Sequence, residues 1–86
     1  MSLTFRYRRH VLEALLSHGV MPTPRTPPEL VRDFVRDLYR YEIRRLRERY
    51  LRGEFAKTEY GDRVEALRRK YPVLALRARD WLESPA

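Results

Sequence analysis

Arginine provides the most prominent chemistry in this sequence. Four arginines follow one another along a predicted helix at spacings of four, four and three residues: Arg36, Arg40, Arg44 and Arg47. That spacing puts their side chains on one helix face. The planar guanidinium group binds phosphate or carboxylate through two parallel hydrogen bonds. The sequence therefore predicts a candidate polyanion-binding surface, which we call the arginine ridge. Tyr41 and Tyr50 lie nearby in the sequence and could stack on nucleic-acid bases.

Acidic residues beside the arginine ridge support a second interpretation. Four acid–arginine pairs have helical spacing: Asp33–Arg36, Asp37–Arg40, Arg44–Glu48 and Glu48–Arg52. Pairs at this spacing form ion pairs on helix surfaces, which contribute about 0.2–0.5 kcal/mol each. The ridge would then be a solvated and partly neutralised face. We favour this interpretation over nucleic-acid binding, because the acids dilute the positive stripe that a dedicated nucleic-acid binder shows.

The remaining side chains predict no catalytic, cofactor or metal site. His10 and His18 are eight residues apart, about 12 Å along a helix, which is too far for both to bind one metal ion. The chain has no cysteine and only three glycines, so thiol catalysis and glycine-rich phosphate loops are excluded. No serine has the setting of a catalytic nucleophile. We therefore expect a protein that is not an enzyme.

Composition predicts one small basic domain. The 86 residues include 19 Lys+Arg and 12 Asp+Glu, for a net charge of +7, and this length fits a single domain over 1–86. No stretch is long and apolar enough to span a bilayer or to form a signal peptide, so we expect a cytoplasmic protein. Peripheral membrane binding by the first helix is a weaker alternative. The many arginines and the absence of Asn, Gln and Cys are typical of a thermophile. A GC-rich genome is the alternative explanation.

Helical spacing and helix-ending residues predict an all-α fold of four helices at about 4–18, 27–52, 57–70 and 72–83, with a proline-rich connector at 19–28. We expect Thr4 and Thr26 to cap the first two helices, the latter in a capping box with Glu29. Gly19 should end the first helix, and Gly53 should make a tight hairpin turn after the second.

Apolar side chains at helical spacing predict the core. On the first helix they are Phe5, Leu12, Leu15 and Leu16, with Val11 at the margin. The long second helix carries one stripe of Val31, Phe34, Val35 and Leu38, and a second, rotated stripe of Tyr39, Ile43, Leu46 and Tyr50. The third helix carries Tyr60, Val64 and Leu67, which should pack on the second stripe across the turn.

The second helix should be about 39 Å long, which is more than the other helices can cover. We therefore predict a non-enzymatic interaction or oligomerisation module. It would be a homodimer, or would bind a protein partner, through Tyr39, Ile43, Leu46 and Tyr50. The alternative is a basic accessory protein that binds nucleic acid through the arginine ridge.

One segment resembles a known family. Arg49-Tyr50-Leu51-Arg52-Gly53-Glu54-Phe55 is followed by Glu59-Tyr60 at the start of the next helix. This pattern is similar to the short bacterial SHOCT-type helical hairpin, over about residues 43–71. Phe55 stands where that pattern has an aliphatic residue, and Ala56 stands where it prefers Ser or Thr. The resemblance implies a helical hairpin and a role in oligomerisation.

Overall fold

The computed structural model describes residues 4–83, and this part of the chain is helical. It holds three α-helices and two short 3-10 helices: α1 (Arg9–Leu16), α2 (Pro28–Leu51), α3 (Lys57–Arg69), η1 (Pro72–Ala75) and η2 (Ala78–Trp81). Residues 4–83 contain no β-strand, only an isolated antiparallel bridge between Tyr7 and Leu82. The all-α prediction is confirmed, whereas the prediction of four α-helices is wrong.

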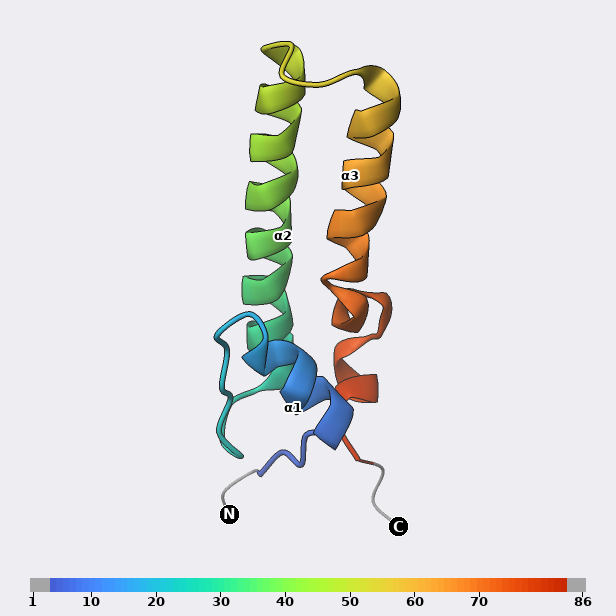
Figure 1. The fold of residues 1–86 in the computed structure, drawn as a ribbon. Coiled ribbons are helices and arrows are strands. Elements are labelled where there is room, and N and C mark those ends of the chain that lie inside the picture. The colour runs from blue at the N-terminus through green and yellow to red at the C-terminus, as the bar shows by residue number, and fades with distance from the viewer. Residues whose placement is uncertain (1–3, 84–86) are drawn as a thin grey trace.

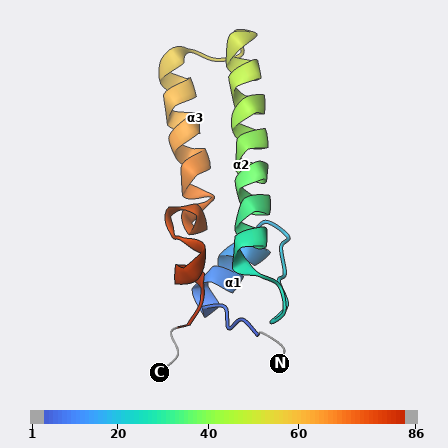
Figure 2. The same cartoon turned by 180° about the vertical axis from the view of Figure 1, so that it is seen from behind.

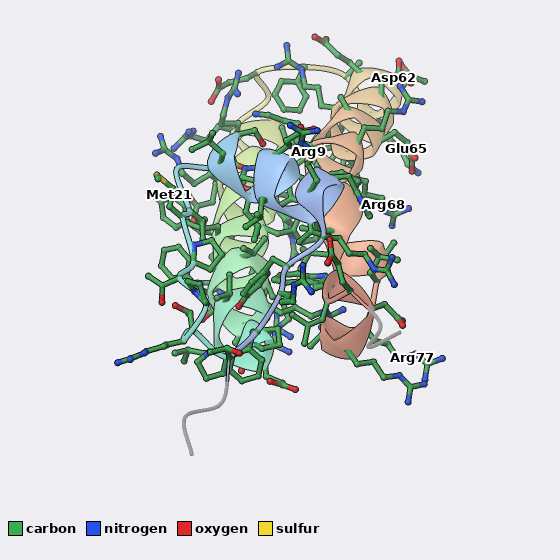
Figure 3. The ribbon with its side chains drawn as sticks, turned by 90° about the horizontal axis from the view of Figure 1, so that it is seen from below. Arg9, Met21, Asp62, Glu65, Arg68 and Arg77 are labelled. Atoms are coloured by element: carbon green, nitrogen blue, oxygen red, sulfur yellow. The ribbon has the colours of Figure 1, made fainter. Side chains whose placement is uncertain are left out.

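Helices α2 and α3 form a long antiparallel hairpin, and α1 lies across its lower end on one face (Figures 1 and 2). The molecule measures 55 × 19 × 18 Å along its principal axes. Seen from below, Asp62, Glu65 and Arg68 point outward from α3, away from α2 (Figure 3). The end of the hairpin that carries the turn projects well beyond α1 and the 3-10 helices (Figure 1).

The turn between α2 and α3 is the one that the sequence predicts. Gly53 has φ +78°, in the left-handed region that a residue without Cβ adopts readily. Its amide donates to the carbonyl of Tyr50 at 2.9 Å, and the amide of Glu54 donates to the carbonyl of Arg49 at 3.2 Å. These two hydrogen bonds define a Schellman motif, which ends the helix sharply.

The predicted capping box at the start of α2 does not form. Thr26 does not cap the helix, and its Oγ1 accepts from the amide of Thr23 at 2.9 Å. The N-cap is Pro27, whose ψ of 133° is extended. The reason is the second proline, because a residue that precedes proline is disfavoured in the α region. The helix consequently begins at Pro28, one residue later than predicted.

Helix α1 begins five residues later than predicted, and Thr4 lies outside it. The preceding segment is held in tertiary hydrogen bonds instead. The amide of Arg8 donates to the carbonyl of Trp81, and the amide of Glu83 donates to the carbonyl of Arg6, both at 2.8 Å. These bonds to the C-terminal segment replace the first turn of the predicted helix.

The predicted fourth helix at about 72–83 is wrong, because η1 and η2 occupy this segment with the extended residue Leu76 between them. The side chain of Arg32, on α2, donates to the carbonyls of Leu74 and Leu76 at 2.9 Å each. It therefore takes acceptors that a continuous helix would use. The break also allows Trp81 to fold back, fully buried, with its indole N–H donating to a carbonyl of η1 at 3.0 Å.

The core is concentrated at the end of the molecule that carries α1, η1 and η2. The buried hydrophobic residues are Tyr7, Val11, Leu15, Val31, Val35, Leu46, Leu67, Tyr71, Val73 and Trp81. Three side chains that the sequence predicts to be inward are exposed, namely Leu12, Leu16 and Phe34. On the two-turn helix α1, packing on η1 buries the alternative i,i+4 pair, Val11 and Leu15.

Candidate interaction surface

The hairpin is closed by the packing that the sequence predicts. Leu46 on α2 and Leu67 on α3 are each only 8% exposed. Nearer the turn, the rings of Tyr50 and Tyr60 stack with centroids 4.5 Å apart and an interplanar angle of 8°. The predicted packing of α3 on α2 is confirmed for the Tyr50–Tyr60 stack and for the burial of Leu46 and Leu67, whereas Ile43 lies on the side of the arginine ridge. Three of the four predicted interface residues are thus engaged inside the chain: Leu46, Tyr50 and also Tyr39, whose ring packs edge-on against that of Tyr71 with centroids 5.3 Å apart.

One edge of Tyr39 and the fourth predicted interface residue, Ile43, lie beside the arginine ridge. Tyr39 and Ile43 are half-buried, and they line a shallow depression of about 250 Å³ together with Arg40, Arg44 and Arg47. We call this site the ridge depression. Its apolar floor and cationic rim combine residues that the sequence pattern assigns to two different functions.

Most of the ion pairs predicted along the arginine ridge are absent from residues 4–83. Arg36 does pair with Asp33, at 3.0 Å. It is half-buried, whereas the other three ridge arginines are exposed. The remaining predicted pairs do not form within residues 4–83: Asp37–Arg40, Arg44–Glu48 and Glu48–Arg52. Within the same range, Arg40, Arg44 and Arg47 have no carboxylate oxygen within 4.0 Å. Their charge is therefore free to act on a ligand.

Glu54 explains one of these differences. It accepts hydrogen bonds from Arg52, which the sequence pairs with Glu48, and from Arg49 at 3.1 Å. The hydrogen bond from Arg49 contributes most to lowering the pKa of the Glu54 carboxyl below its ordinary value of 4.5. The Schellman turn brings Glu54 back toward the end of α2, so two arginines converge on it.

A second surface follows the face of the hairpin that carries α1 (Figure 1). Two adjoining hollows, of about 440 and 710 Å³, share Tyr41, Glu42 and Lys70. We call them together the hairpin groove. Its upper part is lined by Arg45, Arg49, Arg63, Leu46, Ala66 and Leu67, and its lower part by Ala14, Ser17, His18, Leu38, Arg69, Tyr71 and Pro72. Both walls are therefore cationic, and the floor is largely apolar.

A polar cluster closes the base of this groove. Tyr71 donates a hydrogen bond to Glu42, and the ammonium group of Lys70 lies 4.0 Å from the same carboxylate. His18 stacks on Tyr71 at 4.2 Å and donates from Nε2 to the carbonyl of Lys70 at 2.5 Å. Burial, followed by the neighbouring Glu42, raises the pKa of the Tyr71 hydroxyl far above its ordinary value of 10.0. The single carboxylate of the groove is thus already engaged.

The hairpin groove was not predicted from the sequence. Arg45 and Arg49 show the i,i+4 spacing that marks a helix face, and this signal is present in the sequence. Their neighbour Arg63 comes from α3, and Lys70 is the C-cap residue of that helix. The way two helices rotate against each other is set by packing, so the sequence pattern of either helix alone does not reveal the shared groove.

Comparisons with known proteins add no family to these observations. No protein-family model, curated protein or solved structure matches the chain. The resemblance of residues 43–71 to SHOCT-type hairpins therefore stays a prediction carried by those residues. Across residues 4–83, no helix has the length and apolarity needed to cross a membrane. The same range contains no group of three potential metal ligands.

Proposed function

We propose that this protein is a non-enzymatic interaction module whose helical hairpin binds another polypeptide. The observation that carries the proposal is the area that the chain leaves uncovered, 6804 Å². A compact protein of 10.5 kDa exposes about 5,400 Å². The excess of roughly 1,400 Å² is larger than the ~800 Å² that each partner buries in an interface of standard size.

The elongated shape supports the same proposal. The radius of gyration is 15.8 Å, whereas a compact chain of this length has about 12 Å. Most of the core lies at the α1 end, so the far half of the hairpin is covered only by its own two helices. The SHOCT-type resemblance of residues 43–71 points to oligomerisation through this same hairpin. A cytoplasmic location and adaptation to heat accompany the proposal as expectations from composition alone.

Self-association through the ridge depression is the first form of this proposal. Tyr39 and Ile43 supply apolar contact, and Tyr and Arg are enriched where interfaces are buried. Two copies would bring like charges from Arg40, Arg44 and Arg47 close together. Salt screens such repulsion, so the homodimer should become stronger as salt is added.

Sedimentation equilibrium of the full chain tests this form. We expect a dimer for the wild type and a monomer for Ile43→Glu, which puts a charge into the floor of the depression. The matched control is Tyr41→Glu, on the exposed opposite flank of α2, and it should remain a dimer. Far-UV circular dichroism confirms that each variant is folded. A wild-type monomer at concentrations up to about 0.5 mM would refute self-association, because the dissociation constant would then be millimolar or weaker.

A second candidate function is the binding of nucleic acid by the arginine ridge. It is favoured by the lack of carboxylate partners for Arg40, Arg44 and Arg47 within residues 4–83. Replacing all three by Ala should weaken binding to DNA and RNA alike. On duplex DNA, removal of each side chain that binds a phosphate should also reduce the log–log salt slope by about 0.9. Absence of wild-type binding at ~0.15 M salt would rule out this candidate.

A further inference from the structure

The hairpin groove has the dimensions of a site for one additional helix. Its lining extends along α2 from Leu38 to Arg49, a distance of about 16 Å at 1.5 Å per residue. This length accommodates three turns of a docked helix. Ala14 of α1 and its C-cap residue Ser17 form a wall at the lower end, so the groove is bounded by three elements of the chain. An added helix would complete a bundle that α2 and α3 leave open on this face.

The charges around the groove determine which helix fits. Between residues 40 and 70 the hairpin carries 11 basic and six acidic side chains, a net charge of +5. Within residues 4–83, Arg45 has no carboxylate oxygen within 4.0 Å, and its guanidinium group lies over the ring of Tyr41 at 5.8 Å. Glu42, the acid that lines the groove, is held by Tyr71 and Lys70. Arg49, Arg63 and Lys70 already pair with Glu54, Glu59 and Glu42. Within residues 4–83, Arg69 on the α3 wall, like Arg45 on the α2 wall, has no carboxylate oxygen within 4.0 Å. An incoming carboxylate therefore meets one unpaired cation on each wall.

We propose that the hairpin groove binds an acidic amphipathic helix of a partner protein. The apolar stripe of that helix would lie on Leu46, Ala66 and Leu67, and its carboxylates would face the unpaired Arg45 and Arg69 on the two walls. This is the helix-in-groove mode of recognition, with charge complementarity selecting the partner. The proposal rests on the proposed function and specifies a partner class for a face that the ridge depression does not use.

Two other occupants fit this groove less well. Nucleic acid presents phosphates and bases, and neither fills an apolar floor. The ring of Tyr41 is also occupied by Arg45, so it is not open for base stacking on that side. A second copy of this chain would bring its own net charge of +7 to a cationic groove. Among these occupants, only an acidic helix satisfies both the floor and the walls.

The test uses a designed peptide of 18 residues, with leucine along one helix face and glutamate elsewhere. Fluorescence anisotropy measures its binding to the full chain at ~0.15 M salt, near a Debye length of 8 Å. Two variants each replace one arginine of α2 by glutamate, on opposite flanks of the helix. Arg45→Glu changes the hairpin groove, and Arg44→Glu changes the ridge depression. Arg45→Glu should weaken binding about tenfold or more, while Arg44→Glu should change it less than about threefold.

A third variant separates shape from charge. Ala66→Lys adds a cation but fills the exposed apolar floor of the groove. We expect it to weaken peptide binding, whereas unspecific attraction between opposite charges would become stronger. Far-UV circular dichroism of each variant confirms the fold before binding is measured.

Several results would overturn the proposal. These are the absence of peptide binding, equal binding of a scrambled peptide of the same composition, and equal weakening in Arg44→Glu and Arg45→Glu. A 20-base-pair duplex that binds with sensitivity to Arg45 would assign the groove to nucleic acid instead. A dimer of the chain that Arg45→Glu dissociates would assign it to a second copy. Sedimentation of the chain alone reports on the proposed function, so failure of the peptide leaves that result intact.

Discussion

Truncation of Leu67 to Ala should destabilise the hairpin strongly. Leu67 is 8% exposed and faces the buried side of α3 beside Leu46. Deletion of a buried leucine side chain costs about 2–5 kcal/mol, and the cost is lower where the surroundings can relax. Both leucines line the groove, which is open to solvent on one side. We therefore expect a loss at the lower end of that range, ~2–3 kcal/mol.

Thermal and urea denaturation, followed by circular dichroism, measure this loss. For a domain of this size each kcal/mol shifts Tm by about 4–8 °C, so the variant should melt roughly 10–20 °C lower. The control is Leu51→Ala near the end of α2, where the side chain is 70% exposed, and it should change stability by less than about 0.5 kcal/mol. A loss below about 1 kcal/mol for Leu67→Ala, or equal losses for both variants, would refute the packing described for the hairpin.

Three further predictions concern the turn and the titrating groups. Gly53→Ala should destabilise the fold by about 1–2 kcal/mol, because residue 53 has a positive φ. Gly61→Ala lies inside α3, where there is open space around a Cβ, and should stabilise the fold by roughly 0.8–1 kcal/mol. Equal effects of the two substitutions in urea denaturation would contradict this. Because the pKa of Tyr71 is raised, its contribution to stability is present below pH 10.0 and is lost as the pH rises further, so Tyr71→Phe should lose less stability than the wild type in alkali. Because Arg49 lowers the pKa of Glu54, that contribution is present above pH 4.5 and is lost in acid, so Glu54→Gln should differ from the wild type at pH 7 and converge with it at lower pH in denaturation experiments.

The sequence predicted the hairpin well because its signals are local. Gly53 sits where the left-handed conformation is needed, and Tyr60, Val64 and Leu67 repeat at helical spacing beside the complementary stripe of α2. Such signals depend on a few neighbouring residues and on the periodicity of one helix. They identify the existence and the end of α2 and α3 correctly.

The termini were predicted less well, because tertiary contacts override local preference there. The segment before α1 pairs with the C-terminal segment, and Arg32 takes the carbonyls that a fourth helix would need. Tertiary contacts also decide which face of α1 is buried. The sequence alone cannot choose the face, because both Val11 with Leu15 and Leu12 with Leu16 form an apolar i,i+4 pair.

The candidate site was predicted in part. The spacing of Arg40, Arg44 and Arg47 correctly indicated a shared face, and Tyr39 and Ile43 lie beside them. Spacing also suggested ion pairs that do not form, because exposed side chains at i,i+3 or i,i+4 gain only about 0.2–0.5 kcal/mol from pairing. So small a gain does not fix the conformation of a long side chain.

The molar mass in solution tests most directly whether the uncovered hairpin surface binds a second copy of the chain. Light scattering of the wild type at low and high salt measures that mass, with the absorbance at 260 and 280 nm recorded on the same peak. We predict a molar mass of twice 10.5 kDa, a protein-like absorbance ratio and a larger dimer fraction at high salt. A monomer at both salt concentrations would contradict self-association, as would a monomer that carries nucleic acid until high salt removes it.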